Sequence, residues 1–186
     1  MSRRLRLLFL IIFLLVTLGA GSARIRLLKE AKSMLLPMGH EAPAFSLPDV
    51  DNKIHNLDDY RGRPVYVTFW ASWCAPCQQE LSVIKEYMAK DTRLEDLAVL
   101  CVAVREDRVS AKGMVEKLEL PFLILLDQRG EVADAYWVRR IPTSYLLDAK
   151  GRIRWRALGY READLKRLFE GPSVLQDLLK PRAGNM

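Results

Sequence analysis

Residues that bind metals are scarce in this sequence. Its 186 residues include three cysteines and two histidines, and His40 and His55 both precede the first cysteine. Three cysteines are too few for a disulfide framework. A structural zinc site needs four ligands, and Cys101 lies within an apolar run. We therefore expect no metal and no other cofactor, and we expect Cys101 to be a buried structural thiol.

Acidic residues are absent from positions 1–26. Five arginines there account for five of the six net positive charges, so the rest of the chain is almost neutral. A nucleic-acid-binding protein needs a basic face on its folded domain. We therefore expect no nucleic-acid partner.

Charged residues of either sign are absent from residues 7–23, and this apolar run follows Arg3, Arg4 and Arg6. A positive segment followed by an apolar stretch is typical of a membrane-targeting element. The stretch is near the lower limit for a bilayer span and long for a signal peptide, so we favour a retained anchor. Cleavage after the small residues 21–23, which would release a secreted form, is the alternative. The positive-inside rule places the remaining chain on the extracytoplasmic, periplasmic side.

The remaining chain has the length of one domain. We expect residues 1–23 to be the anchor or signal segment and residues 24–39 to be a tether. The globular domain is expected at residues 40–180, followed by a tail at residues 181–186.

Apolar runs and helical periodicity alternate through this domain. β-Branched and aromatic runs predict strands, and apolar positions at helical spacing predict helices. The predicted strands cover residues 65–70, 97–104, 122–126, 144–147 and 153–158, and the predicted helices cover about 76–90, 109–118, 162–169 and a short piece ending at 179. This alternation, closed by a hairpin and a helix, indicates an α/β domain with a mixed sheet.

Turn residues predict two hairpins. Residues 49–52 separate two short strand-like runs, 44–47 and 53–57. A second turn, at residues 148–151, leads into a run in which arginines alternate with apolar residues. Such alternation is typical of an edge strand whose charges discourage pairing with other chains.

Two cysteines lie three positions apart in WASWCAPCQQE, residues 70–80. The preceding strand brings Cys74 to the start of a helix, where free backbone N–H groups and the helix dipole stabilise a thiolate. Cys77 lies one turn further on, close enough to form a disulfide and more shielded. Haem attachment requires histidine after the second cysteine, and Gln78 stands there. We therefore interpret Cys74 and Cys77 as a redox pair, with Cys74 attacking and Cys77 resolving the mixed disulfide.

The segment from Trp70 to Cys77 resembles the thioredoxin active site, and Ile141-Pro142-Thr143 resembles the thioredoxin cis-proline loop. The segment that leads up to Cys74 is similar to the corresponding segment of the membrane-anchored TlpA/ResA-type branch; it reads APAFSLPDVDNKIHNLDDYRGRPVYVTFWASWC. The likeness covers about residues 40–170. It implies a thioredoxin fold, with a mixed central β-sheet flanked by helices and an N-terminal β-hairpin extension.

The resemblance also implies roles for individual residues. Pro142 would be cis and lie against the Cys74 sulfur, with the backbone of Ile141 pairing with a substrate strand. Trp73 would form the rim of the site. Glu80, one turn beyond Cys77, would influence the thiols and could move protons for the resolving cysteine.

Two positions depart from the family patterns. Thioredoxins carry a buried aspartate where this sequence has Thr68, so proton handling must differ, which favours a role for Glu80. Many TlpA/ResA-type proteins have threonine before the cis-proline, whereas Ile141 is closer to the reducing thioredoxins.

The resemblance predicts an extracytoplasmic thiol–disulfide oxidoreductase that acts on protein substrates, more as a reductase than as an oxidase. The resemblance also implies substrates in cytochrome c maturation and a transmembrane electron donor that would recharge the protein. Alternatives are a peroxiredoxin-type peroxidase, which would want a Thr-x-x-Cys pocket, and a non-catalytic thioredoxin-like assembly or binding module. A copper-delivery protein would need a later histidine, and none follows His55.

Overall fold

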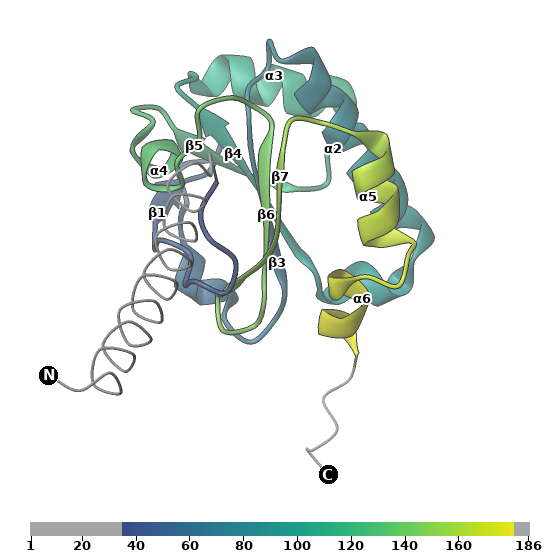
Figure 1. Ribbon diagram of the computed structural model, residues 1–186. Helices are drawn as coiled ribbons and strands as arrows, with labels where there is room; N and C mark the ends of the chain where they lie inside the picture. Colours follow the sequence, from purple (N-terminus) through teal and green to yellow (C-terminus); the bar gives the residue numbers. More distant parts are fainter. Residues whose placement is uncertain (1–34, 181–186) are drawn as a thin grey trace, which may run out of the picture. The chain divides into compact units, whose positions relative to one another are not determined.

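A five-stranded mixed sheet lies at the centre of the computed structural model, which describes residues 35–180 (Figure 1). The strand order is β5-β4-β3-β6-β7. The central strand β3 is parallel to β4 and antiparallel to β6, β5 is parallel to β4, and β7 is antiparallel to β6. The strands are β3 (Val65–Trp70), β4 (Ala98–Val104), β5 (Leu123–Asp127), β6 (Thr143–Leu147) and β7 (Ile153–Leu158). The mixed sheet and the edge position of β7 are confirmed.

Strand β3 is buried along its whole length, as its β-branched and aromatic sequence predicts. Successive side chains of a strand point to opposite faces of the sheet. Tyr66 and Trp70 therefore enter one hydrophobic core, whereas Val67 and Phe69 enter the other. Thr68 lies on the same face of the sheet as Tyr66 and Trp70, so its side chain points toward the core that contains these two residues.

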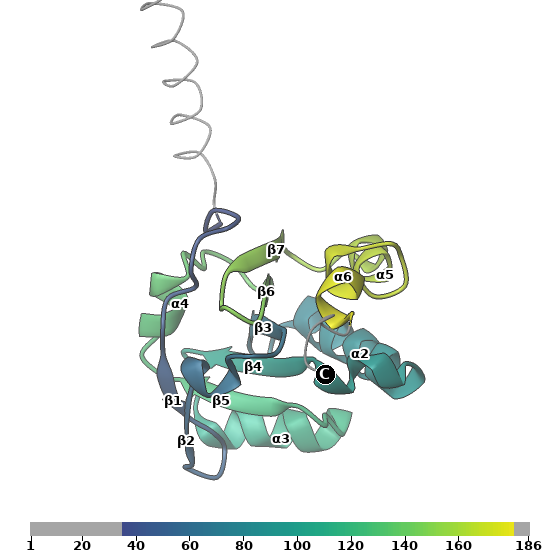
Figure 2. The same cartoon turned by 90° about the horizontal axis from the view of Figure 1, so that it is seen from below.

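Helices cover both faces of the sheet. Figure 2 shows α2, α5 and α6 on one side and α4 with β1 on the other. The helices are α2 (Ala75–Lys90), α3 (Arg108–Leu118), α4 (Glu131–Ala135), α5 (Glu162–Phe169) and α6 (Val174–Leu179), with 3₁₀ turns η1 (Leu57–Tyr60) and η2 (Thr92–Asp96). The predicted helices are confirmed within one or two residues.

Helix α4 was not predicted from the sequence. It is short and begins after Gly130, at a φ of 75°. The carboxylate of Asp127, at the end of β5, accepts hydrogen bonds from the N–H groups of Val132 and Ala133 at 3.3 and 2.8 Å. A side chain several residues upstream therefore stabilises a helix that is too short to show periodicity.

The predicted N-terminal hairpin is present, with strands β1 (Ser46–Pro48) and β2 (Ile54–Asn56). Asp49 Oδ1 accepts hydrogen bonds from the N–H groups of Asp51 and Lys53, at 2.8 and 2.9 Å, and so holds the turn. Leu47 is buried in the core below. The hairpin is thus an extension that packs onto the sheet.

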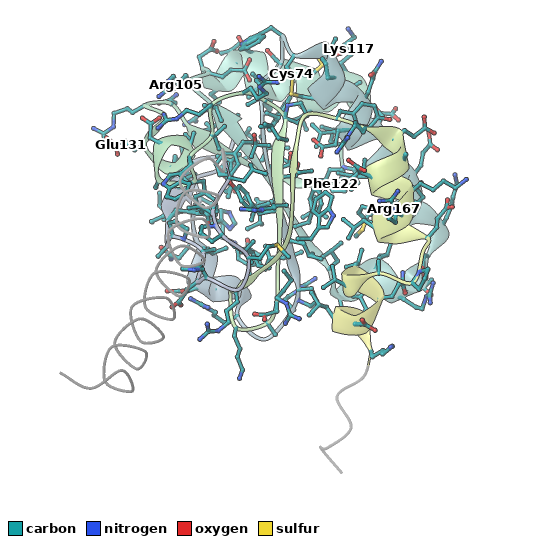
Figure 3. The ribbon with its side chains drawn as sticks, in the orientation of Figure 1. Cys74, Arg105, Lys117, Phe122, Glu131 and Arg167 are labelled. Atoms are coloured by element: carbon teal, nitrogen blue, oxygen red, sulfur yellow. A yellow bond between two sulfur atoms is a disulfide. The ribbon has the colours of Figure 1, made fainter. Side chains whose placement is uncertain are left out.

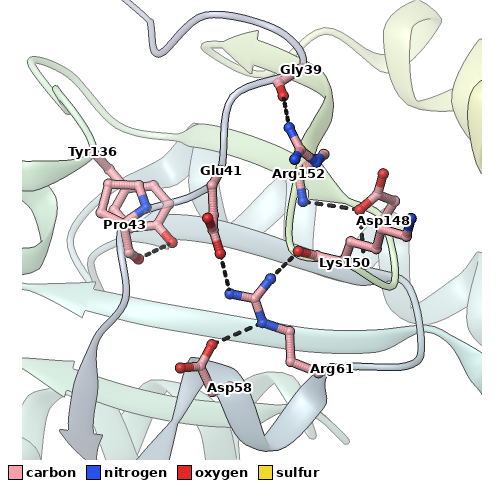
Figure 4. Close-up of polar contacts among 9 residues, drawn as sticks. All are labelled: Gly39, Glu41, Pro43, Asp58, Arg61, Tyr136, Asp148, Lys150 and Arg152. Atoms are coloured by element: carbon pink, nitrogen blue, oxygen red, sulfur yellow. Dashed lines mark hydrogen bonds and ion pairs between the residues drawn. The ribbon is translucent and has the colours of Figure 1, made fainter.

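Arg61 links this extension to the turn between β6 and β7 (Figure 4). Its guanidinium contacts Glu41 Oε1 at 2.7 Å, Asp58 Oδ1 at 2.9 Å and the carbonyl oxygen of Lys150. Leu36 is buried, and the N–H of Gly39 donates to the carbonyl of Ile153 at 2.7 Å. The packed chain therefore begins before residue 40, where we expected a tether to end.

The predicted targeting segment and most of the tether, residues 1–34, lie outside the described residues, as does the tail at 181–186. Between residues 35 and 180, no helix combines the length and the apolar character that crossing a bilayer requires.

Candidate active site

The cysteine pair lies where β3 leads into α2. Cys74 and Cys77 form a disulfide, with their Cα atoms 5.2 Å apart. Cys74 is the N-cap of α2, and the N–H of Cys77 donates to Cys74 Sγ at 3.3 Å. Cys74 is 5% exposed and Cys77 is fully buried. The helix N-terminus thus surrounds the more exposed sulfur with positive backbone groups, which favour a thiolate there.

The loop before Cys74 is held by two polar side chains from other segments. Glu106, which follows β4, accepts hydrogen bonds from the N–H of Ser72, at 3.0 and 2.9 Å, and from its hydroxyl. The amide of Gln78 donates to the carbonyl oxygen of Ser72 at 2.6 Å. The position of Trp73 and Cys74 therefore depends on Glu106, a residue that the sequence did not single out.

The Ile141–Pro142 peptide bond is cis, as the resemblance predicted. Thr143 pairs with Phe69 near the end of β3, so the loop lies beside the strand that leads to the cysteines. Ile141 and Trp73 line the same groove, and Trp73 is 74% exposed. The structure therefore brings together Trp73 and Ile141, two of the three residues expected to contact a substrate, and the third, Pro142, directly follows Ile141.

Glu80 lies three residues after Cys77 on α2 and is buried, with 3% of its surface exposed. Its carboxylate accepts hydrogen bonds from the hydroxyls of Tyr66 at 2.8 Å, Thr68 at 3.1 Å and Ser144 at 2.7 Å. All three come from the face of the sheet that α2 covers. Glu80 is therefore a core residue and not a solvated residue of the helix surface.

Thr68 acquires a clear role in this arrangement. Thioredoxins carry an aspartate at its position, whereas here its hydroxyl donates to Glu80, and Ser144 Oγ lies 3.0 Å from Thr68 Oγ1. The buried carboxylate of this protein thus belongs to Glu80 of α2, and Thr68 of β3 donates a hydrogen bond to it.

Burial raises the pKa of Glu80 above its usual value, although the hydrogen bonds from Ser144, Tyr66 and Thr68 oppose the shift. Burial also raises the pKa of Cys101 well above its usual range, and the charge of Glu80 adds to this. The expectation of a buried Cys101 is confirmed, and its thiol is inert at neutral pH.

Chemically, this arrangement can form and break a disulfide. One sulfur lies at a helix N-terminus, a second lies one turn further in, and a buried carboxyl lies on the same helix. A family comparison agrees: the model of the AhpC/TSA family matches residues 38–156. The chain belongs to the AhpC/TSA family.

Relatives of this protein are named for disulfide exchange. Thiol-disulfide oxidoreductase ResA of Geobacillus thermodenitrificans is 30% identical over 154 residues, which cover 83% of this chain and 88% of the relative. ResA of Geobacillus kaustophilus is 31% identical over 171 residues, covering 91% and 98%.

A solved structure from Chlorobium tepidum, assigned as thiol:disulfide interchange protein DsbE, has a TM-score of 0.69 at 30% identity. The match covers 77% of this chain and 99% of that one. The AhpC/TSA family member described here is thus a thiol–disulfide oxidoreductase of the ResA and DsbE type, with a thioredoxin fold.

Proposed function

We propose that this thiol–disulfide oxidoreductase reduces disulfides in extracytoplasmic proteins through Cys74 and Cys77. The observation that carries the direction is the burial of Glu80 on the helix face of Cys77. A carboxylate there disfavours a nearby thiolate by like-charge repulsion. Oxidants of this fold are strong because their reduced form is stabilised, so a carboxylate that destabilises the thiolate makes the dithiol a better reductant.

The exchange has two steps. The Cys74 thiolate attacks one sulfur of a substrate disulfide, forming a mixed disulfide and releasing one substrate thiolate. Cys77 then loses its proton, attacks the Cys74 sulfur and releases the second substrate thiolate. Two electrons pass from the dithiol to the substrate, and the two thiol protons end on the substrate thiols.

Glu80 is proposed to handle the proton of Cys77. It is the carboxylate one turn from Cys77, and its raised pKa brings its titration closer to neutral pH. The substrate strand is proposed to align on the backbone of Ile141, next to Pro142, with Trp73 as the rim. Glu80 would thus serve the chemistry, whereas the loop and Trp73 would hold the substrate.

The cellular setting is proposed from sequence. The arginine-flanked apolar segment before the domain supports membrane anchoring with the domain on the periplasmic side. A reductase there needs a transmembrane electron donor. Cysteines of cytochrome c precursors are the proposed substrates. Protease treatment of spheroplasts should digest the domain, and carbonate washing should leave it with the membrane; a shortened soluble form would show cleavage instead.

Trapping of mixed disulfides tests the exchange. In Cys77→Ser the resolving thiol is missing, so adducts with other proteins should accumulate through Cys74 and dissolve in reductant. Cys101→Ser, which removes the buried thiol, is the matched control and should trap nothing. Adducts formed by Cys74→Ser but not by Cys77→Ser would reverse the two roles. If neither variant trapped a partner, the proposal would fail.

Direction is tested by the redox state of the pair in cells. Thiol trapping should find Cys74 and Cys77 mostly reduced, and oxidised once the electron donor is removed. A pair that is oxidised in both conditions would indicate an oxidase.

A peroxidase is poorly supported by the same site. Thr68, six residues before Cys74, is fully buried, and its hydroxyl donates to Glu80. It therefore does not face an open peroxide pocket at the Cys74 sulfur.

A further inference from the structure

A groove of about 200 Å³ lies beside the cysteine pair; we call it the Trp73 groove. Its apolar lining comes from three separate segments: Trp73 precedes Cys74, Val104 ends β4, and Val138 and Ile141 precede β6. Trp73 adjoins Cys74 and Ile141 adjoins Pro142 in the chain, so the groove lies next to the sulfur that a substrate must reach.

The remaining lining of the groove is basic. It consists of Arg105, Arg139 and Arg140, and among the described residues that line it none is acidic. Asp134 pairs with Arg105 at 3.1 Å and lies 3.7 Å from Arg139, so one carboxylate faces two guanidinium groups. Arg140 is exposed and has no ion pair with any residue between 35 and 180. The groove therefore keeps an excess of positive charge.

Arg105 extends from the end of β4 toward Gly130 and Asp134. Its backbone lies in the left-handed region, at a φ of 52°, where residues with a side chain are uncommon. Its side chain passes over Gly130, where an added Cβ would lie 2.5 Å from Arg105 Nε. Both oxygens of Asp134 accept from its Nη2 at 3.1 Å. Figure 3 shows Arg105 along the same end of the molecule as Cys74.

We propose that the Trp73 groove selects substrate segments that carry acidic side chains next to the reactive cysteine. The inference rests on the proposed function and names its substrate class. An apolar groove with basic residues on its rim accepts a polypeptide whose apolar side chains lie against Trp73 and Ile141 and whose carboxylates face the arginines. Complementary charge raises the association rate and discriminates against partners of like charge.

The assay uses the reduced protein and three short synthetic peptides, each closed by one internal disulfide. The peptides are identical except that the residues flanking the disulfide are glutamate, glutamine or lysine. The second-order rate of peptide reduction is measured at low and at high salt. We expect the glutamate peptide to react fastest and the lysine peptide slowest at low salt. The differences should shrink as salt screens exposed charges.

The double variant Arg139→Gln/Arg140→Gln tests the groove itself. It should slow reduction of the glutamate peptide about three- to tenfold, as expected for the loss of two exposed charge contacts, and leave the glutamine peptide unchanged. Arg140→Lys, which keeps the charge, should retain most of the preference. Arg167→Gln on α5, distant from Cys74 in Figure 3, removes another exposed positive charge and should change nothing.

The outcomes separate the two proposals. Equal rates for the three peptides would overturn the acidic preference and leave the exchange reaction intact. An equal loss with the glutamate and glutamine peptides in the double variant would also overturn it, because the substitutions would then have disturbed the cysteine site. If no peptide were reduced, the proposed function itself would fail.

Discussion

Replacing Glu80 by glutamine tests whether the buried carboxyl controls the thiols. The change removes one possible negative charge and keeps the size of the side chain. The three hydroxyls around it, from Tyr66, Thr68 and Ser144, can each donate or accept a hydrogen bond, so they can pair with a carboxamide. We therefore expect Glu80→Gln to fold and to change the electrostatics alone.

The size of the effect follows from helix geometry. Side chains three positions apart on a helix, as Cys77 and Glu80 are on α2, lie about 5–6 Å apart at Cβ. Two unit charges about 6 Å apart at an effective dielectric constant of about 20 interact by roughly 3 kcal/mol. That repulsion lowers the thiolate population about a hundredfold when Glu80 is fully ionised. Burial raises the pKa of Glu80, so at a given pH its carboxyl is less ionised than that of an exposed glutamate and the effect falls below this upper value. We expect at least a tenfold rise in thiolate.

The assay is the rate of thiol alkylation against pH for the fully reduced proteins. Removing the carboxylate should lower the apparent thiol pKa, so Glu80→Gln should react faster at neutral pH and its profile should shift to lower pH. Glu86→Gln is the matched control, because Glu86 lies on the same helix, is exposed and pairs with Lys90. Superimposable profiles for wild type and Glu80→Gln would refute the reasoning and leave the two cysteines as the catalytic side chains.

Three further outcomes follow from the same contacts. Burial raises the pKa of Glu80, so the folded protein binds this proton more tightly than the unfolded chain does. The free energy of unfolding should therefore fall as the pH rises from the pKa of Glu80 in the unfolded chain through its pKa in the folded protein. Urea denaturation of Glu80→Gln at the same pH values should not show that fall. Glu106→Ala leaves the N–H of Ser72 without its carboxylate partner and should lower the free energy of unfolding by about 1–3 kcal/mol. It should also slow peptide reduction. Ser72→Ala keeps the hydrogen bond from the N–H to Glu106, so it should lower the free energy of unfolding by less. Leu81→Ala opens a cavity under α2 at a fully buried position and should cost about 2–5 kcal/mol in urea denaturation; a loss below 1 kcal/mol would show that the core there collapses.

Local patterns in the sequence determined the bounds of the central strand, the N-terminal hairpin and the redox pair. The bounds predicted for β3, 65–70, match the structure, because a strand buried on both faces needs a continuous apolar run. The N-terminal hairpin was predictable because Asp49 and Asn52 are turn residues that act on their own neighbours. The redox pair depended only on a strand, a helix start and the spacing of Cys74 and Cys77.

Other features were decided by contacts between distant segments. Helical spacing places Glu80 on the face of Cys77 and Leu81, but whether a carboxyl can be buried there depends on hydroxyls that β3 and β6 present opposite it. Glu106 reaches Ser72 only because β4 ends beside the loop that precedes Cys74. The arginines of the Trp73 groove come from the end of β4 and from the loop before β6. These pairings cross tens of residues, so periodicity and turn chemistry, which act over a few residues, carry no information about them.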